Sequence, residues 1–73
     1  MADIDIKSEI AGKVWLIEAE VGQGVEEDDA VIILESMKME IPVAAPVSGK
    51  ITEILVEKDE AVAEGQTVAR MEG

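Results

Sequence analysis

Short segments in which aliphatic and polar residues alternate recur along the whole chain. Ile4 and Ile6 are flanked by Asp and Lys, a spacing of two that is typical of a β-strand with one buried face. Residues 25–30 and 62–66 have room only for a turn or a very short strand, and no segment suits a helix of normal length. Further segments rich in Val and Ile, bounded by Gly, Pro, Asp or Ser, lie at residues 13–20, 30–35, 40–44, 50–57 and 67–72. The pattern predicts an all-β chain.

The sequence contains two copies of one pattern. A shift of 37 positions aligns the two halves without a gap. We therefore predict a single domain, residues 1–73, with repeats at about 4–35 and 41–72 and a connecting hairpin at 36–39. The aligned pairs include Ile4 with Ile41, Gly12 with Gly49, Lys13 with Lys50, Val25 with Val62, Val31 with Val68 and Glu35 with Glu72.

Neither repeat alone could bury both faces of its strands. Two four-stranded halves related by a pseudo-twofold axis can do so by packing as a small antiparallel sandwich or flattened barrel. The symmetry mate of the hairpin is the place where the last strand meets the first. The duplication therefore predicts that the hairpin and the chain termini lie at opposite ends of the molecule.

Both repeats depart from strict alternation at the same point. The apolar positions Val14 and Ile17 are three residues apart, as are their counterparts Ile51 and Ile54. A β-bulge in each strand would account for this spacing; the alternative is a sheet end at which the alternation matters less. The positions expected to face inward are Val14, Ile17, Ala19, Ile51, Ile54 and Val56.

Glycines occur at matching places in the two repeats. Gly12 and Gly49 each precede a strand, which predicts a turn or a close approach of two backbones. Gly22-Gln23-Gly24 is too short and wrongly placed for a dinucleotide-binding loop, so it is interpreted as a turn.

Composition and charge exclude several kinds of function. The chain has no Cys and no His, which argues against a zinc site, and no nucleophile–base pair is evident. Its 17 acidic and 6 basic residues give a net charge of −11, which disfavours nucleic acid and anionic membranes and favours an electropositive protein partner. The N-terminal segment lacks the basic and apolar runs of a signal peptide, and no stretch could span a membrane. We expect a cytoplasmic protein.

One lysine stands outside the repeat. Lys38 lies in the predicted hairpin and aligns only with Met1. Hairpin tips favour Gly, Asn or Asp, whereas Met37 and Met39 flank this lysine. A solvated turn lysine between two gap-filling methionines is the ordinary interpretation. The absence of a counterpart in the other repeat favours a recognition surface instead.

The local sequence resembles the attachment motif of the biotinyl-domain family, in which Ala or Ser precedes Met-Lys-Met. The resemblance covers nearly the whole chain. In length and motif the sequence is similar to single-domain biotin carriers, also called biotin/lipoyl attachment proteins. It includes Ser36-Met37-Lys38-Met39, the preceding Ile33-Leu34-Glu35, the following Ala45-Pro46-Val47-Ser48-Gly49, and Val62-Ala63-Glu64-Gly65-Gln66.

The resemblance implies a carrier and not an enzyme. Biotin would be attached covalently to Lys38 by a biotin–protein ligase, with Glu35, Ser36, Met37, Met39 and Glu40 as the recognition motif. The carrier would then move a carboxyl group from a biotin carboxylase to a carboxyltransferase. An exposed lysine is protonated at neutral pH and nothing nearby would activate it, so the ligase would have to supply the base. The implied fold is the barrel-sandwich hybrid of biotinyl and lipoyl domains.

Some features depart from the family pattern or leave alternatives open. Residues 8–12 lack the usual Pro, and Asp28 stands where Gly is common. The acidic run at 26–29 lacks the ligand spacing of a calcium loop, and no metal is expected. The gapless repeat leaves no room for the loop called the thumb. The alternatives are a lipoyl carrier on the same lysine, although lipoyl domains typically have Asp and Ala around it, and an acidic interaction module without a prosthetic group.

Overall fold

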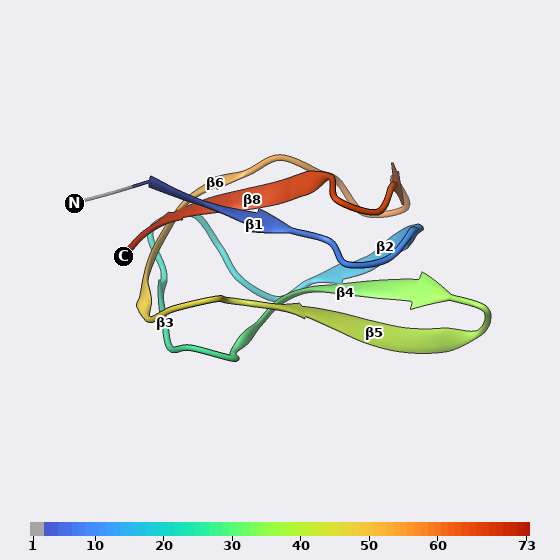
Figure 1. Cartoon of the computed structure of the whole chain (residues 1–73), viewed down its shortest axis with the longest axis horizontal. Coiled ribbons are helices and arrows are strands. Elements are labelled where there is room, and N and C mark those ends of the chain that lie inside the picture. The colour runs from blue at the N-terminus through green and yellow to red at the C-terminus, as the bar shows by residue number, and fades with distance from the viewer. Residues whose placement is uncertain (1–2) are drawn as a thin grey trace.

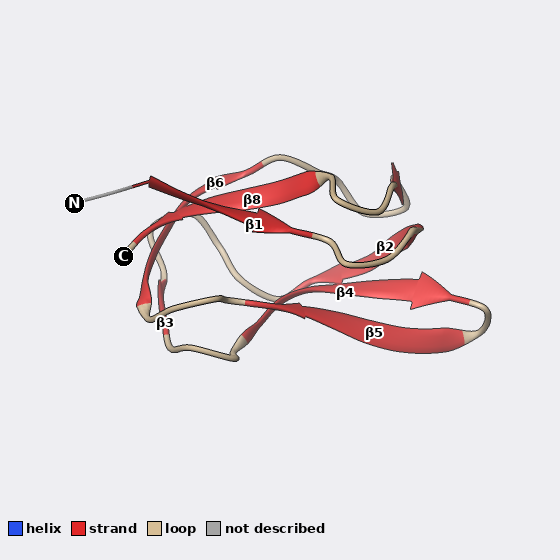
Figure 2. Ribbon diagram, viewed as in Figure 1, coloured by secondary structure: helices blue, strands red, loops and turns tan. Residues whose placement is uncertain are grey.

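The computed structural model describes residues 3–73. Met1 and Ala2, which begin the N-terminal segment and include the repeat counterpart of Lys38, lie outside the described residues. Within residues 3–73 the chain forms strands and no helix (Figure 2), which confirms the all-β prediction. The strands are β1 (Asp3–Lys7), β2 (Gly12–Ile17), β3 (Gly24–Val25), β4 (Ala30–Ser36), β5 (Met39–Ala44), β6 (Gly49–Ile54), β7 (Ala61–Val62) and β8 (Thr67–Glu72).

The strands form two four-stranded antiparallel sheets packed as a sandwich (Figure 1). One sheet has the order β1-β8-β6-β3 and the other has the order β5-β4-β2-β7. The sheets do not close into a barrel. Of the two arrangements expected from the sequence, the sandwich is therefore the one that forms.

Each sheet combines strands from both repeats. Each repeat supplies four strands, as expected, but β5 of the second repeat pairs with β4 of the first, and β1 pairs with β8. The connection between β4 and β5 explains this exchange, because a loop of two residues joins only neighbouring antiparallel strands. The hairpin thus holds β5 in the sheet of β4 and β2, and β1 takes the equivalent place beside β8.

The predicted β-bulges are present in both repeats. The register shifts between Val14 and Leu16 where β2 pairs with β4, and between Ile51 and Glu53 where β6 pairs with β8. The extra residues are Trp15 and Thr52, which are repeat counterparts. A bulge changes the direction of the following side chains, and this explains the spacing of three between apolar positions.

Two strands are shorter than the sequence predicts. The expected strands at 13–20 and 50–57 end at Ile17 and Ile54. After Ile17, the amides of Glu18 and Ala19 both donate to the carbonyl of Val31, at 2.9 and 3.2 Å. Because two successive amides share one acceptor, the regular ladder cannot continue.

Of the six positions expected to face inward, four are buried, one is partly buried and one is exposed. Val14, Ala19, Ile51 and Val56 are buried, and Ile54 packs against the core while remaining partly exposed. The prediction that Ile17 is buried is wrong. It lies opposite the buried Ile32, but it is 37% exposed because its strand ends there.

The core is aliphatic and follows the repeat throughout. The 15 hydrophobic residues that are buried within residues 3–73 include no aromatic side chain. Fourteen of them form seven repeat pairs, and the remaining one, Ala45, is the counterpart of the buried Ser8, whose hydroxyl bonds to the backbone of Ile10. The duplicated pattern therefore specifies one shared core. The pairs are Ile6 with Val43, Val14 with Ile51, Ala19 with Val56, Val25 with Val62, Val31 with Val68, Ile32 with Ala69, and Leu34 with Met71.

Four equivalent turns lie at residues 20–23, 26–29, 57–60 and 63–66. In each, the fourth residue donates its amide to the first carbonyl, and its side-chain oxygen accepts a hydrogen bond from the first amide. The third residue has a positive φ, as in type II turns. It is glycine in two turns and aspartate in the other two, at Gly22, Asp28 (φ 74°), Asp59 (φ 72°) and Gly65. The interpretation of Gly22-Gln23-Gly24 as a turn is confirmed.

The molecule is elongated, with extents of 36 × 17 × 17 Å. The β4–β5 hairpin projects at one end, and β1 begins and β8 ends at the other (Figure 1). This confirms the arrangement predicted from the duplication.

Candidate functional site

The β4–β5 hairpin ends in a two-residue turn that consists of Met37 and Lys38. Ser36 and Met39 pair directly across the base of this turn. Met37 and Lys38 have φ values of 52° and 64°, the pattern of a type I′ turn, in which both central residues adopt the left-handed conformation. That conformation normally selects Asn or Gly, because other L-residues are disfavoured there by roughly 1–2 kcal/mol each. The side chains at the tip are therefore not those that the backbone alone would favour.

The side chains at the tip face solvent. Met37 is 91% exposed and Met39 is 63% exposed, and Lys38 is exposed as well. Within residues 3–73, no ion pair and no side-chain hydrogen bond engages the Lys38 amine. The amine is thus accessible to an incoming group, and the two methionines add little to the core.

Acidic residues flank the turn on both strands. Glu35 of β4 lies directly opposite Glu40 of β5, and both side chains are exposed. Like charges in this arrangement destabilise a strand pair, so folding alone does not favour them. The structure thus brings the whole predicted motif, residues 35–40, together at one end of the hairpin.

A close backbone contact supports the base of the hairpin. A Cβ atom on Gly12 of β2 would lie 2.9 Å from the carbonyl oxygen of Glu35. Gly49, its counterpart, makes the equivalent approach to Glu72, where a Cβ atom would overlap the carbonyl oxygen. Of the two explanations that the sequence left open for these glycines, close approach of two backbones is the correct one.

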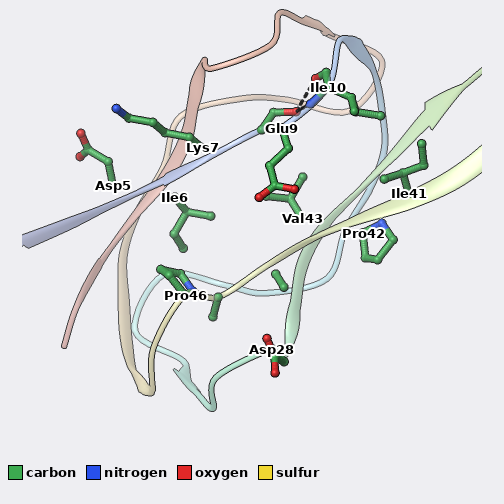
Figure 3. Close-up of a pocket in the computed structure, with 13 residues that line it drawn as sticks. Asp5, Ile6, Lys7, Glu9, Ile10, Asp28, Ile41, Pro42, Val43 and Pro46 are labelled. Atoms are coloured by element: carbon green, nitrogen blue, oxygen red, sulfur yellow. Dashed lines mark hydrogen bonds between the residues drawn. The ribbon is translucent and has the colours of Figure 1, made fainter.

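Two recesses lie away from the lysine. One, of about 340 Å³, lies between the edge strands β1 and β5 and is lined by Ile6, Ile10, Ile41, Pro42 and other residues (Figure 3). The other, of about 250 Å³, is lined by Lys13, Val14, Trp15, Glu35 and Asp59. Neither contains a nucleophile paired with a base. The second recess adjoins the hairpin through Glu35, a proximity that only the strand register reveals.

Other kinds of site find no support in residues 3–73. No group of three or more acidic side chains in this range is arranged to hold a metal ion, and Asp29 of the acidic run is engaged in its own turn. The same residues include no helix long and apolar enough to cross a membrane.

Comparison with known proteins gives consistent matches. Residues 2–71, which include both repeats and the hairpin, match the Biotin_lipoyl family, described as "Biotin-requiring enzyme". The chain is 35% identical over 66 residues to a biotin/lipoyl attachment protein of Bacillus subtilis, and the alignment covers 90% of each protein.

Solved structures show the same fold. The chain superposes on the urea carboxylase of Kluyveromyces lactis with a TM-score of 0.93 and 39% identity, covering 99% of this chain and 6% of the carboxylase. It superposes on the lipoyl domain of the 2-oxoglutarate dehydrogenase complex from Azotobacter vinelandii with a TM-score of 0.77 and 25% identity, over 96% of each chain. The chain thus spans a small part of the carboxylase and nearly the whole lipoyl domain.

Proposed function

Because this chain belongs to the Biotin_lipoyl family, we propose that it is a biotin carrier in which Lys38 is the attachment residue. The observation that carries the proposal is the placement of Lys38. It is an exposed, unpaired lysine at the tip of a hairpin, at the end of the molecule far from the start of β1 and the end of β8, and the left-handed backbone conformation there does not favour a lysine. Two other lysines, Lys13 and Lys50, are repeat counterparts within strands and are explained by the shared fold.

The role of this protein is to position a group and not to catalyse its chemistry. Biotin, when bound, supplies the ring that accepts and releases a carboxyl group. The paired strands β4 and β5 hold the lysine backbone at a fixed place, while the exposed side chain remains free to move. A group tethered in this way is held at roughly millimolar effective concentration near the sites that its tether can reach. No residue beside Lys38 is placed to activate its amine, so the modifying enzyme must supply the base and the activated acyl donor.

The partners that follow are a biotin–protein ligase and the two active sites of a biotin-dependent carboxylase. The similarity to part of a urea carboxylase supports a carboxylase context. The acceptor that receives the carboxyl group belongs to that partner enzyme.

Intact-mass measurement after incubation with ligase, ATP and biotin tests the attachment site. We expect one biotinyl adduct on the wild-type chain, and peptide mapping should place it on Lys38. Lys38→Arg, which keeps the positive charge, should receive no adduct, whereas the control Lys50→Arg should be modified like the wild type. A lipoyl adduct on protein isolated from cells would favour the lipoyl carrier instead, and an adduct on another amine would refute the assignment.

Met37 and Met39 are proposed to contribute to recognition and little to folding. Their exposed fractions of 91% and 63% support this, because little of either side chain is buried. Replacing both with Thr should leave the melting temperature nearly unchanged and slow biotinylation. A folding defect accompanied by normal modification would contradict the proposal.

The attached group is proposed to move more freely than in relatives with a thumb. The connections of the two repeats have matching lengths in residues 3–73, so neither repeat carries an inserted loop. NMR relaxation of the modified protein should show faster motion for the biotin ring than for the β4–β5 backbone. Equal order parameters for ring and backbone would contradict this expectation.

A further inference from the structure

The repeat provides an internal comparison between the outer faces of the two sheets. Because side chains alternate along a strand, Ile33 and Glu35 of β4 point away from the core, to which Ile32 and Leu34 belong. Each outward residue has a counterpart 37 positions away in the other sheet. Both sets lie on the same backbone framework, so a difference between them does not arise from the fold.

The rows nearest the ends of the two sheets are alike in charge. On the sheet that carries the hairpin, the register aligns Glu40, Glu35 and Lys13 across β5, β4 and β2. On the other sheet the counterparts Asp3, Glu72 and Lys50 are aligned across β1, β8 and β6. This row repeats faithfully and needs only a structural explanation.

In the next row toward the middle of each sheet, the side chains at equivalent positions of the two sheets differ completely in chemistry. On the sheet away from the hairpin, Arg70 lies between Asp5 and Glu53 and forms ion pairs with them at 3.1 and 3.5 Å. On the hairpin sheet, the three counterparts are Pro42, Ile33 and Leu16, aligned by the same register. We call these three residues the apolar row.

The apolar row is open to solvent and continues onto an aromatic residue. Leu16 is 37% exposed, Pro42 is exposed and Ile33 is half-buried. Beside them, Trp15 at the β-bulge is 40% exposed and lines a recess with Lys13 and Glu35, which belong to the row nearest the hairpin tip. Its counterpart in the other sheet is the polar Thr52. The fold accommodates a charged and polar set at these positions, so the apolar set serves another purpose.

We propose that the apolar row, together with Trp15, is the docking surface for the biotin–protein ligase. This inference rests on the proposed biotinylation of Lys38. Two of its three residues lie on β4 and β5, the strands that carry the lysine, and Ile33 is three residue steps, or about 10 Å, from the last residue of β4. A ligase must reach the lysine amine itself and has to contact the domain close to the tip. A carboxylase acts on the attached ring, which lies beyond the lysine amine and farther from this face.

Charge indicates the chemistry of the complementary surface. Glu35 and Glu40 border the row on the side of the hairpin, and the whole chain carries a net charge of −11. The matching ligase surface is therefore an apolar patch bordered by Lys or Arg near the active-site entrance. Interface centres of this kind depend on apolar and aromatic contacts surrounded by polar residues.

Placing the charged set of Asp5, Arg70 and Glu53 at the equivalent positions of the hairpin sheet tests the proposal. The variant Leu16→Glu/Ile33→Arg/Pro42→Asp reproduces the set found at the same framework positions of the other sheet. We expect its KM as a substrate of a ligase that modifies the wild-type chain to rise about tenfold or more, with kcat nearly unchanged. The control Glu53→Leu/Arg70→Ile makes the reverse change at two of the three positions of the other sheet and should keep the wild-type KM.

Each outcome decides between distinct possibilities. An unchanged KM for the transplanted variant, with the wild type still modified on Lys38, would overturn the docking proposal alone. Failure of the wild type to be modified on Lys38 would overturn the proposed function. Dimerisation of the wild type that the transplanted variant abolishes would show that a second copy covers this face.

A second measurement applies if the transplanted variant does not fold. Methyl NMR of the wild type titrated with ligase should then show selective shifts at Leu16 and Ile33. The reference methyl of Thr52, on the opposite sheet, should not shift. Shifts confined to the hairpin tip would overturn the proposal.

Discussion

Relieving the backbone conformation at the hairpin tip should stabilise this protein while removing its proposed function. Met37 and Lys38 occupy the two central positions of the turn with φ values of 52° and 64°. Asn and Gly are the residues that suit these positions in a type I′ turn. The variant Met37→Asn/Lys38→Gly therefore replaces a disfavoured pair with the preferred one.

The expected gain follows from the exposure and the dihedral angles. Met37 is 91% exposed. Since burying a whole Met side chain contributes about 1.5–3 kcal/mol, its loss here costs below about 0.3 kcal/mol. Each left-handed residue costs roughly 1–2 kcal/mol, and the glycine returns about 0.5–1 kcal/mol of that through its larger unfolded-state entropy. Over the two positions together, the net increase in the free energy of unfolding should be about 1–3 kcal/mol.

Thermal and urea unfolding of the unmodified proteins measure this gain. In a domain of this size, about 1–3 kcal/mol corresponds to an increase of roughly 4–24 °C in melting temperature. The control Met39→Asn changes a residue in β5, where the backbone is extended, and should lower stability slightly because Asn is disfavoured in strands. If the double variant is no more stable than the wild type, or if Met39→Asn gives the same gain, the reasoning from backbone conformation is wrong.

Three further predictions concern the framework. Gly49→Ala should lower the free energy of unfolding by more than about 3 kcal/mol, because its Cβ would overlap a main-chain carbonyl of β8. Gly12→Ala should lower it by only about 1 kcal/mol, because its Cβ would lie 2.9 Å from the equivalent carbonyl of β4. Equal losses in urea unfolding would contradict this difference between the two approaches. Gly65→Ala should lower the melting temperature more than Gly65→Asp, because Asp28 occupies the same left-handed position in the other repeat, and the reverse order would contradict this account of the turns. Arg70→Met should lower the melting temperature slightly at low salt and not at high salt, because its ion pairs are exposed. The hydrogen bond with Asp5 raises the pKa of Arg70 above its ordinary value, so this difference should persist up to strongly alkaline pH, wherever the carboxylates are ionised.

The family membership and most of the fold could be predicted from the sequence. The motif around Lys38 and the repeat indicated the family that the comparisons show. The spacing of Val14 and Ile17 revealed the β-bulges, because local alternation records the direction of each side chain. The burial of Ile17 was mispredicted, because the sequence does not show where the hydrogen-bonded ladder ends.

The amino-acid sequence by itself determined the strands, the duplication, the turns and the isolated position of Lys38, because these depend on residues close together in the chain. The tertiary structure decided which strands share a sheet. The pairings of β1 with β8 and of β2 with β7 join residues far apart in the sequence. It also decided that Pro42, Ile33 and Leu16 lie in one exposed row while their counterparts form ion pairs around Arg70. Cross-strand register sets such neighbours, and register depends on the packing of both repeats around one core.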